Sequence, residues 1–370
     1  MPEILRLRPV DRVLVLAPHP DDESIACGGL LLATRDVAAA RRVVVITDGD
    51  NNPWPQRWIE KRWQIDAQAR ARWGARRRSE AQTALDVLGV EPAQRFFFGL
   101  PDLGLTNLLM RDDQGLRDGI RTQLEEFQPN LVLAPVIDDH HPDHSALHVA
   151  LRFALWRYRG TPPQVLTFTV HGHASGGDFC EVPLDESQHA TKRQAILCHQ
   201  TQIRLSGRRF LRFAESIERY RLLSMKTPAA LQTHPLRAWL RDDGAVGVRI
   251  DMRRWRDGLH GHELLLAIDS VHGPVLRARL PLPRHADTTA AVQSSVDDAP
   301  FAEVRWQPEG ESLVGTLRLR APWEENGEEC NIGYVKLEKV RRSLRVYDHF
   351  GWQPMDFPAA NSGKTNSLLG

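Results

Sequence analysis

RVLVLAPHPDDE, residues 12–23, joins a short apolar run to a turn that is rich in proline and charge. The apolar run ends at Pro18, and a helical stretch follows from Ser24 to about Ala39. A buried strand, a polar turn and a helix in that order are typical of the first half of a βαβ unit. This stretch therefore predicts an α/β fold that is built on a parallel sheet.

The same alternation continues through the first half of the chain. Apolar runs predict further strands at 42–47, 94–98, 130–135 and 165–170, and helical patterns fall at 76–88, 116–127 and 143–156. In such sheets, ligands bind at the carboxyl ends of the strands. No GxGxxG follows the first strand, so the sequence lacks the fingerprint of a dinucleotide site.

The pattern changes after about residue 225. TPAALQTHP, residues 227–235, resembles a linker, and short strand-like runs separated by turn residues follow it. These runs lie at 245–251, 263–268, 275–280, 302–306, 313–319 and 333–337. Such spacing predicts a β-rich, sandwich-like domain. We expect an α/β domain at 1–227, a smaller β-rich accessory domain at 228–358 and a flexible tail at 359–370.

Composition excludes several classes of protein. The 370 residues are 42% hydrophobic and 26% charged, which is ordinary for a globular protein with a real core. A net charge of +1 offers no global field for nucleic acid, and no apolar run approaches the ~18 residues of a membrane span. Four scattered cysteines without a CxxC pair suit a reducing compartment. We therefore expect a cytoplasmic protein with no nucleic-acid partner and no integral membrane segment; the oligomeric state is not predicted.

Three charged clusters fall where predicted strands end. They are APHPDDE at 17–23, TDGD at 47–50 and DDHHPDH at 138–144. A turn needs polar residues, and a helix start favours an aspartate, but neither needs the histidines. If the first and fourth strands are neighbours in the sheet, these clusters converge on one pocket.

The first cluster has the residue types of a catalytic metal site. His19 and Asp22 are three residues apart on a turn stiffened by two prolines, so both can face one point. A third ligand from the other cluster would leave a position open for water, as catalytic zinc requires. Asp21 would then lie beside the metal, where a carboxylate can accept a proton from water. Spacing alone does not choose the third ligand among four histidines: His140, His141, His144 and His148.

The sequence resembles the LmbE/PIG-L family of zinc-dependent N-acetylglucosaminyl deacetylases over residues ~10–223. The resemblance rests on a set of motifs in order: APHPDDE (17–23) with Gly28-Gly29, TDGD (47–50), Arg77-x-x-Glu80 with Ala84 and Leu88-Gly89, GLPD (99–102), HPDH (141–144), and Lys192-x-x-Ala195 leading to His199-x-x-Gln202. It implies a Rossmann-like sheet with helices on both faces that is not a dinucleotide site.

The resemblance also implies a role for each residue of the site. His19, Asp22 and His144 would be the metal ligands, for Zn²⁺ or alternatively Fe²⁺. Asp21 would be the general base. His141 would stabilise the oxyanion and protonate the leaving amine, and Asp143 would orient His141. Asp50 and Arg77 match positions near the sugar pocket, where Arg78 could replace Arg77.

The segment 51–73 departs from the family in its length and its tryptophans. Trp54, Trp58 and Trp63 have a spacing that favours packing of one helix face on the core, and Trp73 follows. The alternative is a platform on which tryptophan rings stack on sugar, with Trp54 as the candidate substrate contact. The basic run 70–78 is expected to be a solvated helix face, or alternatively a grip on an anionic substrate.

The leading hypothesis is a metal-dependent hydrolase that removes acetyl from an N-acetylated amino sugar or sugar conjugate. Its motivation is the ordered pair HPDDE and HPDH at strand ends. Two alternatives stay open at this stage. One is a non-haem iron enzyme that uses the same two-histidine, one-carboxylate set. The other is a non-catalytic protein that binds glycans through its C-terminal β domain.

Overall fold

The structure is a computed structural model, and its chain divides into two compact units. Unit 1 comprises Met1–Leu109 and Asp113–Ser224, and unit 2 comprises Met110–Asp112 and Met225–Gly370. The described residues are 3–172, 178–224, 234–255, 261–270, 275–283, 288–297, 300–319, 331–340, 347–348 and 350–357. The predicted boundary after residue 227 and the predicted tail at 359–370 both lie outside these residues.

Unit 1 is built on one mostly parallel sheet with the order β1-β7-β8-β6-β5-β2-β3-β4. Its strands are β1 (Glu3–Ile4), β2 (Arg12–Ala17), β3 (Ala40–Thr47), β4 (Arg95–Leu100), β5 (Leu131–Pro135), β6 (Gln164–Phe168), β7 (Phe179–Pro183) and β8 (Ile217–Leu223). The five strands from β4 to β6 pair in parallel, whereas β8 is antiparallel to both of its neighbours. Along the chain, β3 and β4 are added on one side of β2, and β5 and β6 are added on its other side. The direction in which strands are added therefore reverses between β2 and β5.

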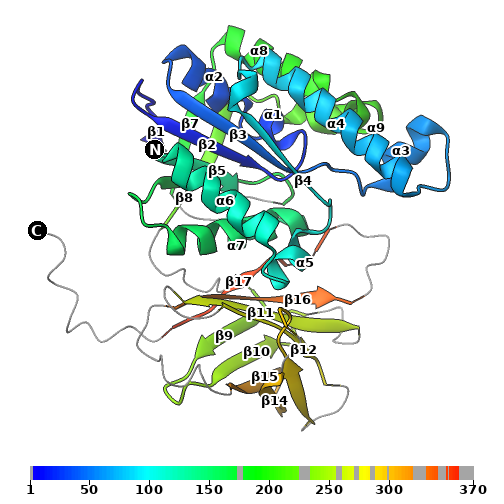
Figure 1. Ribbon diagram of the computed structural model, residues 1–370, viewed down its shortest axis with the longest axis vertical. Coiled ribbons are helices and arrows are strands. Elements are labelled where there is room, and N and C mark those ends of the chain that lie inside the picture. The colour runs from blue at the N-terminus through cyan, green and yellow to red at the C-terminus, as the bar shows by residue number, and fades with distance from the viewer. Residues whose placement is uncertain are drawn as a thin grey trace, which may run out of the picture. The chain divides into compact units, whose positions relative to one another are not determined.

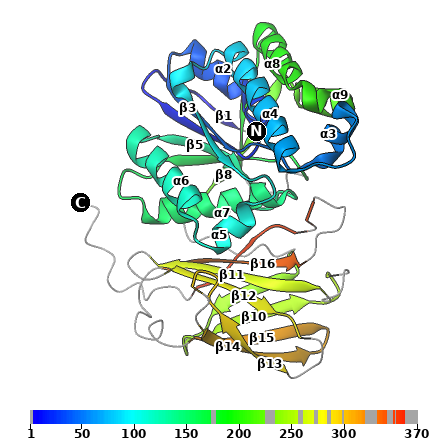
Figure 2. The same cartoon turned by 45° about the vertical axis from the view of Figure 1, so that its right-hand side comes forward.

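Helices cover both faces of this sheet, as expected (Figure 1). They are α1 (Asp22–Ile25), α2 (Gly28–Asp36), α3 (Pro53–Glu60), α4 (Ala67–Val87), α5 (Leu105–Met110), α6 (Gln114–Phe127), α7 (Pro142–Arg157), α8 (Glu186–Cys198) and α9 (Gln200–Phe210), with short 3₁₀ turns η1 (Pro92–Gln94) and η2 (Leu211–Phe213). Helices α2, α4 and α8 pack together over one face, and α6 and α7 over the other (Figure 2).

Most predicted elements of unit 1 are confirmed, and two predictions were wrong. The single helix predicted from Ser24 to Ala39 is two helices, because the chain leaves helical geometry at Cys27. The helix predicted at 76–88 begins earlier, at Ala67, where the Asp66 side chain accepts a hydrogen bond from the Ala69 amide and caps it. Strands β1, β7 and β8 were not predicted.

Unit 2 is a sandwich of two antiparallel sheets, which confirms the β-rich expectation. One sheet has the order β13-β14-β15-β10-β9 and the other β12-β11-β16-β17. Their bounds are β9 (Leu236–Leu240), β10 (Val246–Asp251), β11 (His262–Ser270), β12 (Val275–Pro281), β13 (Thr288–Gln293), β14 (Pro300–Glu309), β15 (Ser312–Leu319), β16 (Asn331–Lys339) and β17 (Gln353–Pro354). A single apolar core, with Trp306, Val248 and Leu266 among its members, joins both sheets.

Candidate active site

The three charged clusters come together at the carboxyl ends of the central strands of unit 1. Strand β2 leads into the turn at 18–21 and then into α1, and β5 leads through 136–141 into α7. Because β2 and β5 are hydrogen-bonded neighbours, their following turns lie side by side. This is the point where the strand order reverses, and ligands of open α/β sheets bind there.

His19, Asp22 and His144 form a nearly equilateral triangle of ligand atoms. Nδ1 of His19 lies 3.2 Å from Oδ2 of Asp22, and Nε2 of His144 lies 3.2 Å from the same oxygen. The two histidine nitrogens are 3.3 Å apart. Ligands placed about 2.0–2.1 Å from a tetrahedral ion are separated by about 3.3–3.4 Å, so the triangle has the dimensions of one face of a zinc site.

Carboxylates face the outer nitrogens of both histidines. Asp102 Oδ1 lies 3.2 Å from Nε2 of His19, and Asp139 Oδ2 lies 3.2 Å from Nδ1 of His144. These are close contacts without hydrogen-bond geometry, and Nε2 of His19, Oδ1 of Asp102 and Nδ1 of His144 are buried without a hydrogen-bond partner among the described residues. Metal-ligating histidines almost always donate their other N–H to such a group, which fixes the tautomer and raises the basicity of the ligand nitrogen. The residues present therefore fit a divalent metal.

The site is electrostatically prepared for a cation. Burial alone would lower the pKa of both histidines, but neighbouring carboxylates raise the pKa of His144 to about 9 and that of His19 well above its ordinary value. Burial would raise the pKa of Asp22, yet the two histidines hold it well below its usual range. The negative carboxylates that favour a proton on each buried imidazole also favour a metal ion in place of those protons.

Asp21 is held in an unusual conformation beside this triangle. Its φ is 153°, a region that residues other than glycine rarely adopt. Its amide donates to Oε2 of Glu23 at 2.9 Å, and its Oδ2 accepts from Arg77 at 2.9 Å. Burial raises the pKa of Asp21 to about 6, although Arg77 acts to lower it. The carboxylate is thus fixed at the main chain and at one oxygen.

His141 lies against the triangle at the start of α7. Its ring centroid is 4.5 Å from that of His19 and 5.2 Å from that of His144. Nδ1 of His141 accepts a hydrogen bond from the Asp143 amide at 3.3 Å. In a neutral ring the proton then sits on Nε2, which becomes the donor. Burial and the neighbouring imidazoles hold the pKa of His141 well below its ordinary value.

The Asp143 carboxylate ties the site to the segment before α5. It accepts from the amides of Leu103 at 2.6 Å and Leu105 at 3.0 Å, and it lies 3.4 Å from Nε2 of His19. The amide of Asp143, rather than its carboxylate, makes the hydrogen bond to His141. Orientation of His141 by Asp143 stays a prediction, and the hydrogen bond between the two residues involves the Asp143 main chain.

The three predicted substrate residues have different environments. All three hydrogen bonds of Arg77 are to Asp21, the Pro20 carbonyl and the Gly49 carbonyl, at 2.8–2.9 Å. Asp50 accepts from Arg70 at 3.2 Å and from the Asp102 amide at 3.3 Å. Trp54, on α3, is 44% exposed. Arg77 therefore supports Asp21, and the predicted contacts of these residues with substrate stay predictions.

The predicted packing of Trp54, Trp58 and Trp63 on the core was wrong, and Trp73 is the buried tryptophan of this segment. Trp73 is fully buried, whereas Trp58 is 74% and Trp63 is 80% exposed. The arginines of α4 that follow Trp73 are paired with carboxylates, as with Arg78 and Asp48 at 2.6 Å. The alternative of a grip on an anionic substrate by this run is not favoured, because its charges are already neutralised.

Sequence reasoning assigned no role to several residues that shape the site. Asp102 and Asp139 lie inside motifs that it quoted, but only the fold shows which imidazole each one faces. His199 lies 3.0 Å from Glu23 Oε1, and Arg209 donates to His171 at 3.0 Å. The His171 ring is 5.1 Å from that of His144. His199 lies in a motif of the family resemblance, but no local sequence signal shows that it faces Glu23 or that Arg209 and His171 are partners.

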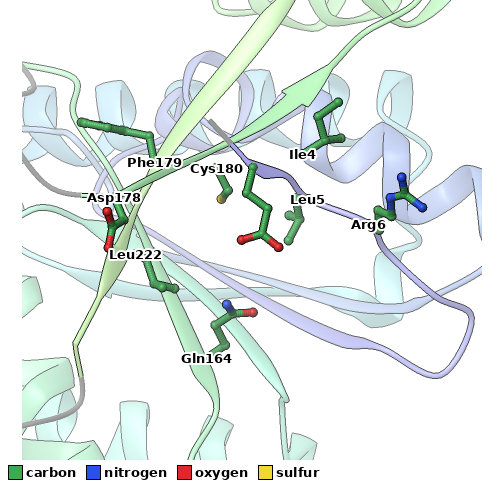
Figure 3. Close-up of a pocket in the computed structure, with 9 residues that line it drawn as sticks. Ile4, Leu5, Arg6, Gln164, Asp178, Phe179, Cys180 and Leu222 are labelled. Carbon is green, nitrogen blue, oxygen red and sulfur yellow. The ribbon is translucent and has the colours of Figure 1, made fainter. Parts of the chain in front are cut away.

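A separate cavity of about 570 Å³ lies at the other end of β6 (Figure 3). It is lined by Glu3, Ile4, Leu5, Arg6, Gln164, Asp178, Phe179, Cys180 and Leu222. Gln164 is the first residue of β6, whereas the site residues follow the carboxyl ends of strands. None of the predicted site residues lines this cavity.

Comparison with known proteins places the site in a family. Residues 14–155 match the family model PIG-L, described as GlcNAc-PI de-N-acetylase. The match includes the HPDDE and HPDH motifs and every residue of the ligand triangle. Residues 14–155 are a PIG-L domain. The family resemblance expected from the motifs is thereby confirmed.

The chain is also similar to a curated protein over part of its length. The chain is 32% identical over 158 residues to 2'-N-acetylparomamine deacetylase of Streptomyces fradiae, covering 39% of this chain and 52% of that protein. It thus spans about half the length of this curated relative.

Two solved structures are also similar. The A40926 pseudoaglycone deacetylase Dbv21 has 23% identity and a TM-score of 0.46 over 59% of this chain and 99% of its own. The N,N'-diacetylchitobiose deacetylase of Pyrococcus horikoshii has 19% identity and a TM-score of 0.45 over 58% and 84%.

The length and hydropathy of the described helices bear on membrane association. None of these helices is both long enough and apolar enough to cross a bilayer.

Proposed function

We propose that unit 1 is a metal-dependent hydrolase that removes the acetyl group from an N-acetylated amino sugar or sugar conjugate. The observation that carries the proposal is the triangle of His19, Asp22 and His144, with all sides at 3.2–3.3 Å and Asp21 adjacent. The PIG-L match supports deacetylation as the reaction class. The similarity to an aminosugar deacetylase supports a GlcNAc-type substrate.

The ligand set favours Zn²⁺, and Fe²⁺ also suits two histidines and one carboxylate. His19 Nδ1, Asp22 Oδ2 and His144 Nε2 would hold the ion. A bound zinc ion polarises a carbonyl and lowers the pKa of water to about 7. The protein's own part in the reaction falls to Asp21, His141 and the groups that hold them.

Asp21 is placed to act as the general base. Arg77 occupies its Oδ2 at 2.9 Å, which leaves Oδ1 to take a proton from the attacking water. The Glu23 hydrogen bond to its amide prevents the carboxylate from rotating away with its main chain. Such fixation lowers the cost of aligning base and water in the transition state.

His141 is placed to serve the other end of the amide. With Nδ1 accepting from the Asp143 amide, Nε2–H can donate to the oxygen that becomes negative as water adds to the carbonyl. The proton that Asp21 takes from the water must reach the nitrogen before the C–N bond breaks, and His141 would pass it on, which returns Asp21 to its carboxylate form. The products are acetate and the free amine.

The test is acetate release by the zinc-loaded full chain from a panel of N-acetylated sugars and sugar conjugates. Asp21→Asn is the test variant. Asp138→Asn is the matched control, because the Asp138 side chain pairs with Arg221 at an N–O distance of 3.4 Å and is not one of the three triangle residues. We expect release by wild type and by the control, and a loss of at least about 100-fold in Asp21→Asn. Equal rates in all three proteins would contradict the proposal.

A further inference from the structure

The tryptophans of α3 and the turn after it form an exposed apolar group that the proposed reaction does not use. Trp54 and Trp58 are four residues apart on one helix face, and Trp63 follows in the turn. Trp58 is 74% and Trp63 is 80% exposed, and a group of exposed apolar side chains, unlike single scattered ones, often marks an interaction site.

This group is held rigidly rather than left loose. The opposite face of α3 is buried through Pro55 and Gln56, and Gln56 donates to the Ala69 carbonyl of α4 at 2.6 Å. Arg57 stacks over the Trp54 ring at 5.0 Å and donates to the Trp63 carbonyl at 2.9 Å. The tryptophans therefore stay outward because their own backbone is anchored to α4.

Unneutralised cations lie in the turn after α3 and on the neighbouring helix α9. Helix α9 packs against α3, and the two lie side by side in both views (Figures 1 and 2). Five exposed basic residues lie in the turn after α3 and along α9–η2: Lys61, Arg62, Arg204, Arg208 and Arg212. Within the part of the chain that the structure describes, none of them is in an ion pair. The arginines of α4, by contrast, are paired with Asp50, Glu60, Glu80, Asp21 and Asp48.

We propose that this Trp–Arg face is a docking surface for an anionic lipid bilayer. The face is defined as Trp54, Trp58, Trp63, Leu205 and the five basic residues named above. Tryptophan favours the boundary between headgroups and acyl chains, and long basic side chains reach anionic headgroups while their stems stay apolar. The unpaired positive charge is complementary to anionic lipid, which attracts basic residues at a surface.

The form of the face distinguishes a bilayer from a nucleic acid. Single-stranded nucleic acid also accepts cations and aromatic rings, but it is held in a groove that follows its backbone. Here the tryptophans stand on a helix and turn at the periphery of unit 1 (Figure 2). Exposed side chains on a peripheral helix and turn offer a contact surface to a partner that is itself flat. The proposal does not depend on the hydrolase activity.

Vesicle co-sedimentation of the full chain tests the proposal. Vesicles of phosphatidylcholine alone are compared with vesicles that contain about one third phosphatidylserine. The test variants are Trp58→Ser/Trp63→Ser and Arg204→Gln/Arg208→Gln. The charge-matched control is Arg117→Gln/Arg121→Gln, which removes the same number of positive charges from α6, where Arg117 is half-buried, Arg121 is exposed and both are ion-paired. Circular dichroism shows whether each variant is folded.

We expect wild type and the control to bind the phosphatidylserine vesicles and both test variants to bind at least about tenfold more weakly. High salt should release wild type, and brominated lipid should quench its tryptophan fluorescence but not that of the tryptophan variant. Failure of wild type to bind these vesicles would overturn the proposal, as would equal binding by all four proteins. Binding of single-stranded DNA through the same residues, without vesicle binding, would assign the face to nucleic acid instead and also overturn it.

Discussion

Asp139→Asn should weaken metal binding through His144 while leaving the three ligands in place. Oδ2 of Asp139 lies 3.2 Å from Nδ1 of His144 and accepts from the amides of Val170 at 3.0 Å and His171 at 3.1 Å. Oδ1 accepts from the His141 amide at 2.9 Å. Every direction around this carboxylate therefore needs an acceptor, and asparagine can offer only one oxygen.

The size of the effect follows from those contacts. The least costly orientation places the new oxygen at Oδ2, so the new NH₂ group faces the His141 amide. One buried hydrogen bond is lost and two donors face each other, which costs about 1–3 kcal/mol in the free energy of unfolding. The charge behind His144 also disappears, and removal of such a partner weakens metal binding about 10-fold to 100-fold.

Competition with a chromophoric zinc chelator measures the affinity, and thermal unfolding without metal measures the stability. Asp138→Asn is the control, because it makes the same chemical change one residue earlier, at a half-buried side chain paired with Arg221. The control should bind zinc as wild type does. Unchanged zinc affinity in Asp139→Asn would refute the assignment of Asp139 as the partner of a metal ligand.

Four further substitutions test the packing around the site and on the surface of unit 1. Gly29→Ala should destabilise unit 1 by about 1–3 kcal/mol in chemical unfolding, since its Cβ would lie 2.8 Å from Glu218 Cδ, and a smaller loss would show that this carboxylate can move. Trp73→Ala should cost about 3–5 kcal/mol in the same assay because the ring is fully buried, whereas Trp58→Ala should stay within about 0.5 kcal/mol; similar losses would contradict their assigned burial. Arg77→Lys should lower kcat about 10-fold to 100-fold with little change in KM, because lysine cannot make the three hydrogen bonds that hold the proposed base. A kcat equal to that of wild type would show that this support is dispensable.

The sequence is informative where local chemistry decides the structure. The run RVLVLA and the NLVLAP segment have no other plausible state than buried strands, and the structure has them as β2 and β5. The charged turns that follow them converge because consecutive βαβ units place strand ends on one edge. The clusters are therefore recognisable from the sequence, whereas the choice of His144 as a ligand rests on the family resemblance and stays a prediction.

Long-range contacts decide the features that the sequence did not show. Strands β7 and β8 are antiparallel and alternate apolar with charged residues, so their short segments carried no signal strong enough to predict them. The spacing of Trp54 and Trp58 fits a buried helix face, but Pro55 and Gln56 occupy that face instead. Asp139 resembles any turn aspartate until the structure places it behind His144.

The continuous helix predicted after residue 24 was wrong for a related reason. Buried Glu218 accepts hydrogen bonds from the amides of Gly29 and Leu30 at 2.7 and 2.8 Å. These amides are free to donate only because a new helix begins at Gly28, so the break and its partner on β8 belong together. A residue 189 positions away caps this helix, and helical periodicity cannot reveal such a partner.

Anomalous diffraction from crystals soaked in zinc tests the central claim most directly. His19 has carboxylates near both of its ring nitrogens, so two positions compete for an ion. One is the triangle with Asp22 and His144, where His141 also lies within reach of an ion, and the other is the group with Asp102 and Asp143. We predict one peak about 2.0–2.2 Å from Nδ1 of His19, Oδ2 of Asp22 and Nε2 of His144. A peak on Nε2 of His19 with Asp102 and Asp143, or no peak at either position, would contradict the account.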